Sequence, residues 1–155
     1  MNSYRRTLLK GAGATGGLAV AFALGLLRPS QAAAAWTDGD FQVEGLDTLM
    51  KSVGAIEATN DDRIKVEVPE IANNGSVVPV TVTSAIPGTE SIAILADKNP
   101  LPLLGVFEFQ DGAQGYASTR VKMRETSAIR AVVKVGDKYY MNERLVKVTI
   151  GGCGG

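Results

Sequence analysis

Residues 129–141, with the sequence IRAVVKVGDKYYM, have the pattern of two β-strands joined by a tight turn. Apolar side chains recur at every second position from Ile129 to Val135, which is the period of a half-buried strand. Gly136-Asp137 then interrupts the pattern, and a glycine-containing pair between two such runs is typical of a two-residue hairpin turn. Tyr139-Tyr140-Met141 begins the returning strand. The sequence therefore predicts an antiparallel hairpin that further strands can join.

Short alternating or apolar segments, separated by turn residues, fill the chain on both sides of this hairpin. Pro69, Asn73-Asn74-Gly75 and Pro87-Gly88 are turn signals. Pro79 lies inside one segment and predicts an edge position there, because proline cannot donate a ladder hydrogen bond. Seven or eight short strands at regular spacing predict an all-β fold, an immunoglobulin-like β-sandwich. The expected strands lie within residues 64–68, 77–83, 92–96, 106–109, 117–123, 129–135, 139–141 and 146–150.

Residues 36–60 precede the expected sandwich domain, which we place at residues 61–150. Between Asp40 and about Ile56, apolar residues recur at helical spacing, which predicts a short amphipathic helix, although Gly45 and Gly54 weaken the pattern. We expect this helix to pack on the sandwich or on a partner. The apolar positions are Phe41, Leu46, Leu49, Met50 and Val53.

Residues 1–35 have the pattern of an export signal. Arg5-Arg6 is followed by an apolar run from Gly11 to Leu27 and by the small residues 32–35, just before Trp36. A charged region, an apolar region and a small-residue end are typical of a secretory signal, and the arginine pair favours the twin-arginine route. We therefore expect a cleaved leader and a periplasmic protein. A membrane anchor is the alternative, because the apolar run is 17 residues long.

The charge balance argues against nucleic acid and anionic membranes as partners. The chain has 16 basic and 16 acidic residues. Removal of the leader takes four basic residues, so the mature balance is 12 − 16 = −4. A mildly acidic domain has no electrostatic attraction for polyanions. We expect no nucleic-acid partner, and no membrane association after cleavage.

Few residues are available for catalysis. The chain has no histidine, which excludes imidazole metal sites and histidine-based nucleophile activation. Asp61-Asp62 are adjacent carboxylates for which a solvated turn is the simpler interpretation. Arg120, Lys122 and Arg124 are spaced to share one face of a strand, where they could hold an anion or an acidic partner, or form a solvated outer face. We predict no catalytic residue, no metal site and no cofactor.

The C-terminal residues Gly151-Gly152-Cys153-Gly154-Gly155 contain the only cysteine of the chain. Glycine brings no apolar surface to bury a thiol and loses much conformational freedom on ordering. Lys147-Val148-Thr149-Ile150 is expected to end the last strand and to fix the root of this segment. We predict that residues 151–155 form a flexible arm carrying a functional thiol, the alternative being a tail without function. Five extended residues reach roughly 17 Å.

The thiol of Cys153 has no activating group nearby in the sequence. No cation lies between Lys147 and the terminus, and reactive thiols usually need a cation, a metal or a helix N-terminus. An ordinary thiol with a pKa of about 8.5 is mostly protonated at neutral pH. Such a group is a poor catalyst and a suitable substrate for another protein's active site.

The leader, the β domain and the terminal Gly-Gly-Cys-Gly-Gly together resemble the SoxY family, the sulfur-carrier subunits of the periplasmic thiosulfate-oxidising Sox system. The resemblance covers most of residues 63–155, and the terminal pentapeptide is its most specific part. It includes Val68-Pro69-Glu70-Ile71-Ala72-Asn73-Asn74-Gly75, Val78-Pro79-Val80, Lys98-Asn99-Pro100 and Lys147-Val148-Thr149-Ile150.

This resemblance implies an immunoglobulin-like domain that forms a heterodimer with a SoxZ-like β subunit. It implies that Cys153 carries the pathway intermediates covalently and that the carrier itself catalyses nothing. It also implies three transient partners: a haem-containing enzyme that couples thiosulfate to the thiol, a dimanganese hydrolase that releases sulfate, and a sulfane dehydrogenase.

Three other functions are compatible with the residues. In ubiquitin-like sulfur carriers the terminal Gly-Gly becomes a thiocarboxylate, which would make Gly154-Gly155 the active end; that activation needs cytosolic ATP chemistry, against which the leader argues. Cys153 could instead link two copies by a disulfide in a structural role, since thiol–disulfide exchange needs only access and some thiolate. A chemically silent interaction module is the third.

Overall fold

The computed structural model describes residues 36–110 and 112–151. The expected leader and Gly152 to Gly155 lie outside these residues. Within them the chain forms a 3-10 helix, one α-helix and nine strands. The elements are η1 (Asp38–Gln42), α3 (Leu46–Ser52), β1 (Thr59–Asn60), β2 (Ile64–Glu67), β3 (Ile71–Ala72), β4 (Val78–Ser84), β5 (Ser91–Ala96), β6 (Leu103–Glu108), β7 (Gly115–Val121), β8 (Ser127–Val135) and β9 (Lys138–Val148).

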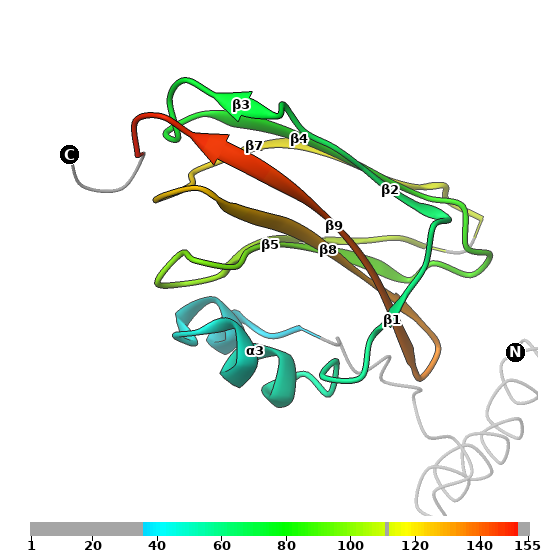
Figure 1. Cartoon of the computed structure of the whole chain (residues 1–155). Coiled ribbons are helices and arrows are strands. Elements are labelled where there is room, and N and C mark those ends of the chain that lie inside the picture. Colours follow the sequence, from blue (N-terminus) through cyan, green and yellow to red (C-terminus); the bar gives the residue numbers. More distant parts are fainter. Residues whose placement is uncertain (1–35, 111, 152–155) are drawn as a thin grey trace, which may run out of the picture. The chain divides into compact units, whose positions relative to one another are not determined.

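The strands form two sheets that pack face to face (Figure 1). The large sheet has the order β1-β9-β8-β5-β6, with β3 paired to the end of β9, and the small sheet has the order β2-β4-β7. The predicted hairpin is formed by β8 and β9, the longest strand pairing in the large sheet, and Val135 lies opposite Lys138. Gly136 has a φ of 56°, as two-residue hairpin turns require. The prediction of an all-β sandwich is confirmed.

Within the large sheet, the interior strand β5 is buried on both faces. All six residues of β5 are buried. Ile92 and Ile94 face the small sheet and share a core with Val80. Ala93 and Leu95 point the other way and pack with the helical segment. A continuous apolar run is what a strand covered on both sides needs, whereas β4, covered on one side, alternates between buried and less buried residues.

The predicted N-terminal helix exists, but it is shorter than expected. Gly45, with a φ of 80°, separates η1 from α3, and Gly54, with a φ of 73°, follows the end of α3. Glycine is the residue that adopts positive φ without strain, so these two positions bound the α-helix. Leu49 and Met50 are buried against the large sheet together with Trp36. The helix therefore packs on the sandwich, which is one of the two possibilities expected, the other being a partner.

Pro79 has the edge position that the sequence predicts, although the strand that contains it is not an edge strand. Pro79 belongs to β4, which lies between β2 and β7 in the small sheet. β2 ends at Glu67, opposite Thr81, so at Pro79 the strand pairs only with β7, through Arg120. The proline is tolerated because it lies beyond the end of the shorter neighbour, where a missing donor breaks no ladder on that side.

Two of the nine strands cannot be predicted from the alternation of apolar residues. β1 and β3 have two residues each, too few to show an alternation, and both pair with β9 in parallel. The expected strands at 139–141 and 146–150 form one strand, β9, so seven expected strands are present in the described residues and β1 and β3 raise the number to nine. β3 brings its part of the chain to the C-terminal end of β9 (Figure 1).

Candidate functional site

The end of β9 is held by the chain segment that contains β3. Ile71 lies opposite Lys147 and Ala72 opposite Val148. Past the strand, the backbone N–H of Thr149 donates to the Ala72 carbonyl at 3.1 Å, and its hydroxyl donates to the Asn73 carbonyl at 2.8 Å. The chain is thus bonded to residues 70–75 until it reaches residue 150. We call this region, residues 70–75, 97–100, 122–126 and 147–151, the arm root.

Gly75 connects the last residues to a third segment. Its N–H donates to the Ile150 carbonyl at 2.7 Å, and its own carbonyl accepts from the N–H of Met123 at 2.7 Å. The predicted turn at residues 73–75 is present, because the Asn74 side chain accepts from the Ser76 N–H at 2.8 Å. A side chain that bonds the backbone two residues on is the usual asparagine turn, and here it places the Gly75 peptide between two distant segments.

Asn99 holds the segment that contains Met123. Its side-chain amide nitrogen donates to the Lys122 carbonyl at 2.8 Å, and its amide oxygen accepts from the Arg124 N–H at 2.9 Å. The residue is 8% exposed, so these bonds satisfy a buried polar side chain that would otherwise be costly. Thr126 adds a contact to β9, since its hydroxyl accepts from the Val148 N–H at 2.9 Å.

Gly151 is the last described residue, and there is no room for a side chain on it. A Cβ built at this position would collide with the carbonyl oxygen of Arg124. The constraint is one of space, because the neighbouring atom is backbone and cannot rotate away. Cys153, Gly152, Gly154 and Gly155, as well as Arg5 and Arg6, lie outside the described residues.

The basic residues at the arm root come from another part of the sequence. β7 ends at Val121, so of the expected basic trio only Arg120 belongs to the strand. Lys122 and Arg124 lie in the loop after it, and both are exposed. The expectation that all three share a strand face is therefore wrong. Lys98 approaches Glu125 at 3.8 Å, an exposed pair. The loop after β7 also places the Arg124 backbone against Gly151. This contact cannot be predicted from residues 147–155 alone.

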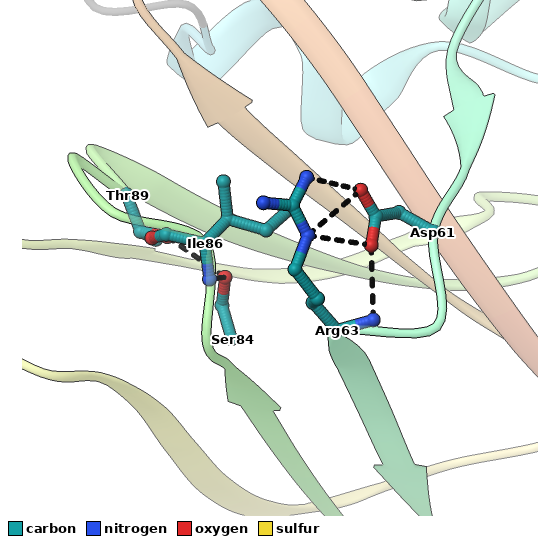
Figure 2. A network of polar contacts seen from close by, with 5 residues as sticks. All are labelled: Asp61, Arg63, Ser84, Ile86 and Thr89. Atoms are coloured by element: carbon teal, nitrogen blue, oxygen red, sulfur yellow. Dashed lines mark hydrogen bonds and ion pairs between the residues drawn. The ribbon is translucent and has the colours of Figure 1, made fainter.

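The predicted carboxylate pair lies at the opposite end of the small sheet and has a different environment from the expected one. Figure 2 shows Asp61 bound to Arg63, whose Nη2 and Nε donate to its two oxygens at 2.6 Å and 3.0 Å. These hydrogen bonds lower the pKa of Asp61 to about 2. Asp62 is exposed. In the described part of the chain, no three His, Cys, Asp or Glu side chains are grouped as metal ligands would be.

Taken together, the described residues form a β-sandwich that anchors a C-terminal segment at one end. The model of the family described as Sulfur oxidation protein SoxY matches residues 49–153, and the chain belongs to the SoxY family. Its members are sulfur carriers and not enzymes.

A solved structure agrees with this assignment. The sulfur carrier protein SoxY from Chlorobium limicola f thiosulfatophilum is 34% identical, with a TM-score of 0.60, over 66% of this chain and 89% of that one. A Jonesia denitrificans lytic polysaccharide monooxygenase matches with 18% identity and a TM-score of 0.36, over 59% of this chain and 58% of that one, which is too low to bear on function. No curated protein matches the chain. Among residues 36–110 and 112–151, no helix is long and apolar enough to cross a bilayer.

Three of the segments that carried the resemblance meet at the arm root. Residues 68–75 pair with the end of β9, residues 98–100 contribute Asn99, and residues 147–150 are the anchored segment itself. They are separated by tens of residues in the sequence. Their shared place in the fold makes the arm root the candidate functional site.

Proposed function

We propose that the Cys153 thiol is the covalent attachment point for sulfur intermediates during thiosulfate oxidation, and that residues 151–155 present it to other enzymes. The observation that carries this proposal is the family match, which extends to Cys153 itself. Two facts support it: Cys153 is the only cysteine in the chain, and the fold anchors the chain up to Ile150, three residues before it.

The proposed chemistry requires a partner at each step. In the first, the thiol loses its proton, a disulfide bond forms between Sγ and the sulfane sulfur of thiosulfate, and two electrons pass to a haem-containing enzyme. In the second, water attacks the sulfonate sulfur, the bond between the two thiosulfate sulfurs breaks, sulfate and a proton leave, and Cys153 keeps a persulfide. A dimanganese hydrolase performs this step, and a sulfane dehydrogenase acts on the remaining sulfur.

The carrier is proposed to act as a heterodimer with a SoxZ-like subunit in the periplasm. The support for export is in the sequence: residues 1–35 have the pattern of a twin-arginine signal with Arg5-Arg6. The division of the mature chain into a helical segment at 36–60, a sandwich at 61–150 and an arm at 151–155 belongs to the same proposal. The packing of α3 on the large sheet supports treating 36–150 as one folded body.

Replacement of the thiol tests the proposal. Cys153→Ser, incubated with thiosulfate and periplasmic extract of the native host, should gain no mass in intact-protein mass spectrometry, whereas wild type gains bound sulfur. Its thermal midpoint should be unchanged, because the substitution lies beyond the anchored residues. Gain of sulfur on the terminal carboxyl instead would favour the ubiquitin-like alternative, and recovery of only disulfide-linked dimers would favour the structural one.

A displaced thiol is the matched control. Ser118→Cys in the Cys153→Ser background restores one cysteine on the exposed side of β7. This variant should react with a small alkylating reagent and still receive no sulfur from the extract. Equal loading of the displaced thiol would show that any accessible cysteine suffices, and the carrier role of residues 151–155 would be withdrawn.

A further inference from the structure

The contacts of the arm root link its four segments in a closed ring, which we call the circuit. Asn99 binds the Lys122 carbonyl and the Arg124 N–H. Met123, between them, donates to the carbonyl of Gly75, and the N–H of Gly75 donates to the carbonyl of Ile150. The residue after Ile150 is Gly151, whose backbone lies directly over the Arg124 carbonyl. The circuit therefore begins and ends at Arg124.

Arg124 is held from both sides of its own backbone. Its N–H is fixed by the Asn99 oxygen at 2.9 Å, and its carbonyl oxygen occupies the space where a side chain of Gly151 would be. Because peptide groups are planar, the bonds to the Lys122 carbonyl and the Arg124 N–H orient the two peptide planes on either side of Met123, so the Arg124 carbonyl can turn only about the φ and ψ of Arg124 itself. The place of Gly151 is thus coupled, through Arg124, to an asparagine 52 positions earlier in the sequence.

We propose that Asn99 is a positioning residue for the reactions of Cys153, and that the point from which the thiol is presented is Gly151 resting on the Arg124 carbonyl. This inference rests on the proposed carrier function. Cys153 is two residues beyond Gly151, so its backbone can reach only about 7 Å from that point. With so short a reach, a displacement of the point where the chain leaves the domain also displaces the region that the thiol of Cys153 can reach. Misplacement by about 1 Å can cost up to roughly 100-fold in rate.

The chain offers a closely matched control for Asn99. Asn142 is also 8% exposed; its side chain donates to the Ile64 carbonyl at 2.7 Å and accepts from the Glu143 N–H at 2.8 Å. Asn99→Ala and Asn142→Ala therefore each remove one buried amide and two hydrogen bonds to backbone. Both should lower the thermal midpoint by similar amounts. Asn142 does not touch the circuit, so only Asn99→Ala should change the presentation of Cys153.

Two measurements report on the circuit without any partner. Amide hydrogen exchange at Gly75 and Met123 should rise in Asn99→Ala and stay unchanged in Asn142→Ala. A nitroxide attached to Cys153, the only thiol, should give a narrower spectrum in Asn99→Ala. Alkylation of the thiol by iodoacetamide should proceed at the wild-type rate in both variants, because access to a small reagent does not depend on where the chain leaves the domain.

The functional measurement is the initial rate of sulfur loading, at several carrier concentrations, with thiosulfate and host periplasmic extract. Asn99→Ala should lower the loading efficiency roughly tenfold relative to Asn142→Ala, mainly by raising the carrier concentration needed for half-maximal rate. Gly151→Ala gives a second route to the same loss, because its methyl group would be forced against the Arg124 carbonyl. Gly152→Ala adds the same methyl group and the same loss of backbone freedom one residue later, and it should lower the loading efficiency less than Gly151→Ala does.

The outcomes separate this inference from the function it rests on. If wild type itself acquires no sulfur on Cys153, the proposed function fails. If wild type is loaded and Asn99→Ala is loaded as efficiently as Asn142→Ala, Asn99 has no positioning role. If Gly151→Ala and Gly152→Ala lose efficiency equally, the glycines matter only for flexibility and the Arg124 contact is irrelevant. Should Asn99→Ala fail to fold, the pair of glycine variants still decides the question.

Discussion

The two ends of the sandwich differ in where their hydrogen bonds converge. At the arm root, hydrogen bonds join segments far apart in the sequence: Thr149 to Asn73, 76 residues apart, and Arg124 to Asn99, 25 residues apart. At the opposite end, near residues 61–63 and 84–89, long-range bonds such as that from Asn142 to the Ile64 carbonyl, 78 residues apart, are accompanied by local ones. Thr89 bonds the Ile86 carbonyl three residues away, and Arg63 bonds Asp61 two residues away (Figure 2).

This convergence shows which point of the backbone is fixed by several segments at once. A local contact shapes its own loop and leaves the neighbouring strands free to shift, whereas a contact between distant segments ties several strands to one point. At the root, that point is where the chain leaves for Cys153. The far end has a polar surface hollow, lined by residues 84–90, 109–110 and 112–115.

The largest expected effect separates overall stability from the placement of the arm root. Leu49 is fully buried between α3 and the large sheet, so Leu49→Ala should cost about 2–5 kcal/mol of unfolding free energy. Leu145→Ala is the control, because Leu145 is 59% exposed, and it should change stability by less than about 0.5 kcal/mol. Denaturant titration followed by Trp36 fluorescence measures both.

In native buffer, Leu49→Ala should leave amide exchange at Gly75 no faster than global unfolding explains. A selective rise at Gly75 would mean that α3 contributes to the arm root, and the two ends could not then be treated as separate from the helical face.

An intermediate effect is expected from a pair of threonines that compares the two ends directly. The hydroxyl of Thr149 donates to the Asn73 carbonyl at 2.8 Å, and that of Thr89 to the Ile86 carbonyl at 2.8 Å. Replacing either with valine removes such a bond and should cost about 1 kcal/mol. Thr149→Val should speed amide exchange at Gly75 about fivefold, and Thr89→Val should not. Equal responses at Gly75 would remove the distinction between the two ends.

The sequence allowed the sandwich to be predicted and left the arm root largely hidden. Alternation of apolar residues and the Gly136-Asp137 turn report on local geometry, and both predictions were correct. The root depends on backbone groups of residues more than 20 positions apart, which leave no periodic signal. Asn99 has the appearance of an ordinary turn residue beside Pro100, and its two bonds become evident only when Lys122 and Arg124 are placed next to it.

Gly151 illustrates the same limit. It belongs to a terminal segment in which every residue other than Cys153 is glycine, so the sequence favours a role in flexibility alone. The collision that any side chain would make with the Arg124 carbonyl gives it a steric role that differs from that expected for the other four arm residues. Pro79 was predicted correctly as an edge position, but the proline rule does not show that this edge arises because the neighbouring strand β2 ends opposite Thr81.

The smallest effect is expected at the far end and depends on pH. The Arg63 hydrogen bonds lower the pKa of Asp61 to about 2. A carboxylate whose pKa is lower in the folded state stabilises the fold above its unfolded pKa of about 3.9, and the contribution is lost as the pH falls toward 2. Asp61→Asn should therefore lower the thermal midpoint slightly at pH 7, where the contribution is fully present, and flatten the fall of the midpoint between pH 4 and pH 2. Asp62→Asn, the adjacent exposed carboxylate, is the control and should retain the wild-type slope.

Because the pair is local and at the surface, the effect of Asp61→Asn should be slight, and Gly75 exchange should not respond at any pH. A change at Gly75 would mean that the two ends are coupled through the small sheet, which the separation of their contacts excludes.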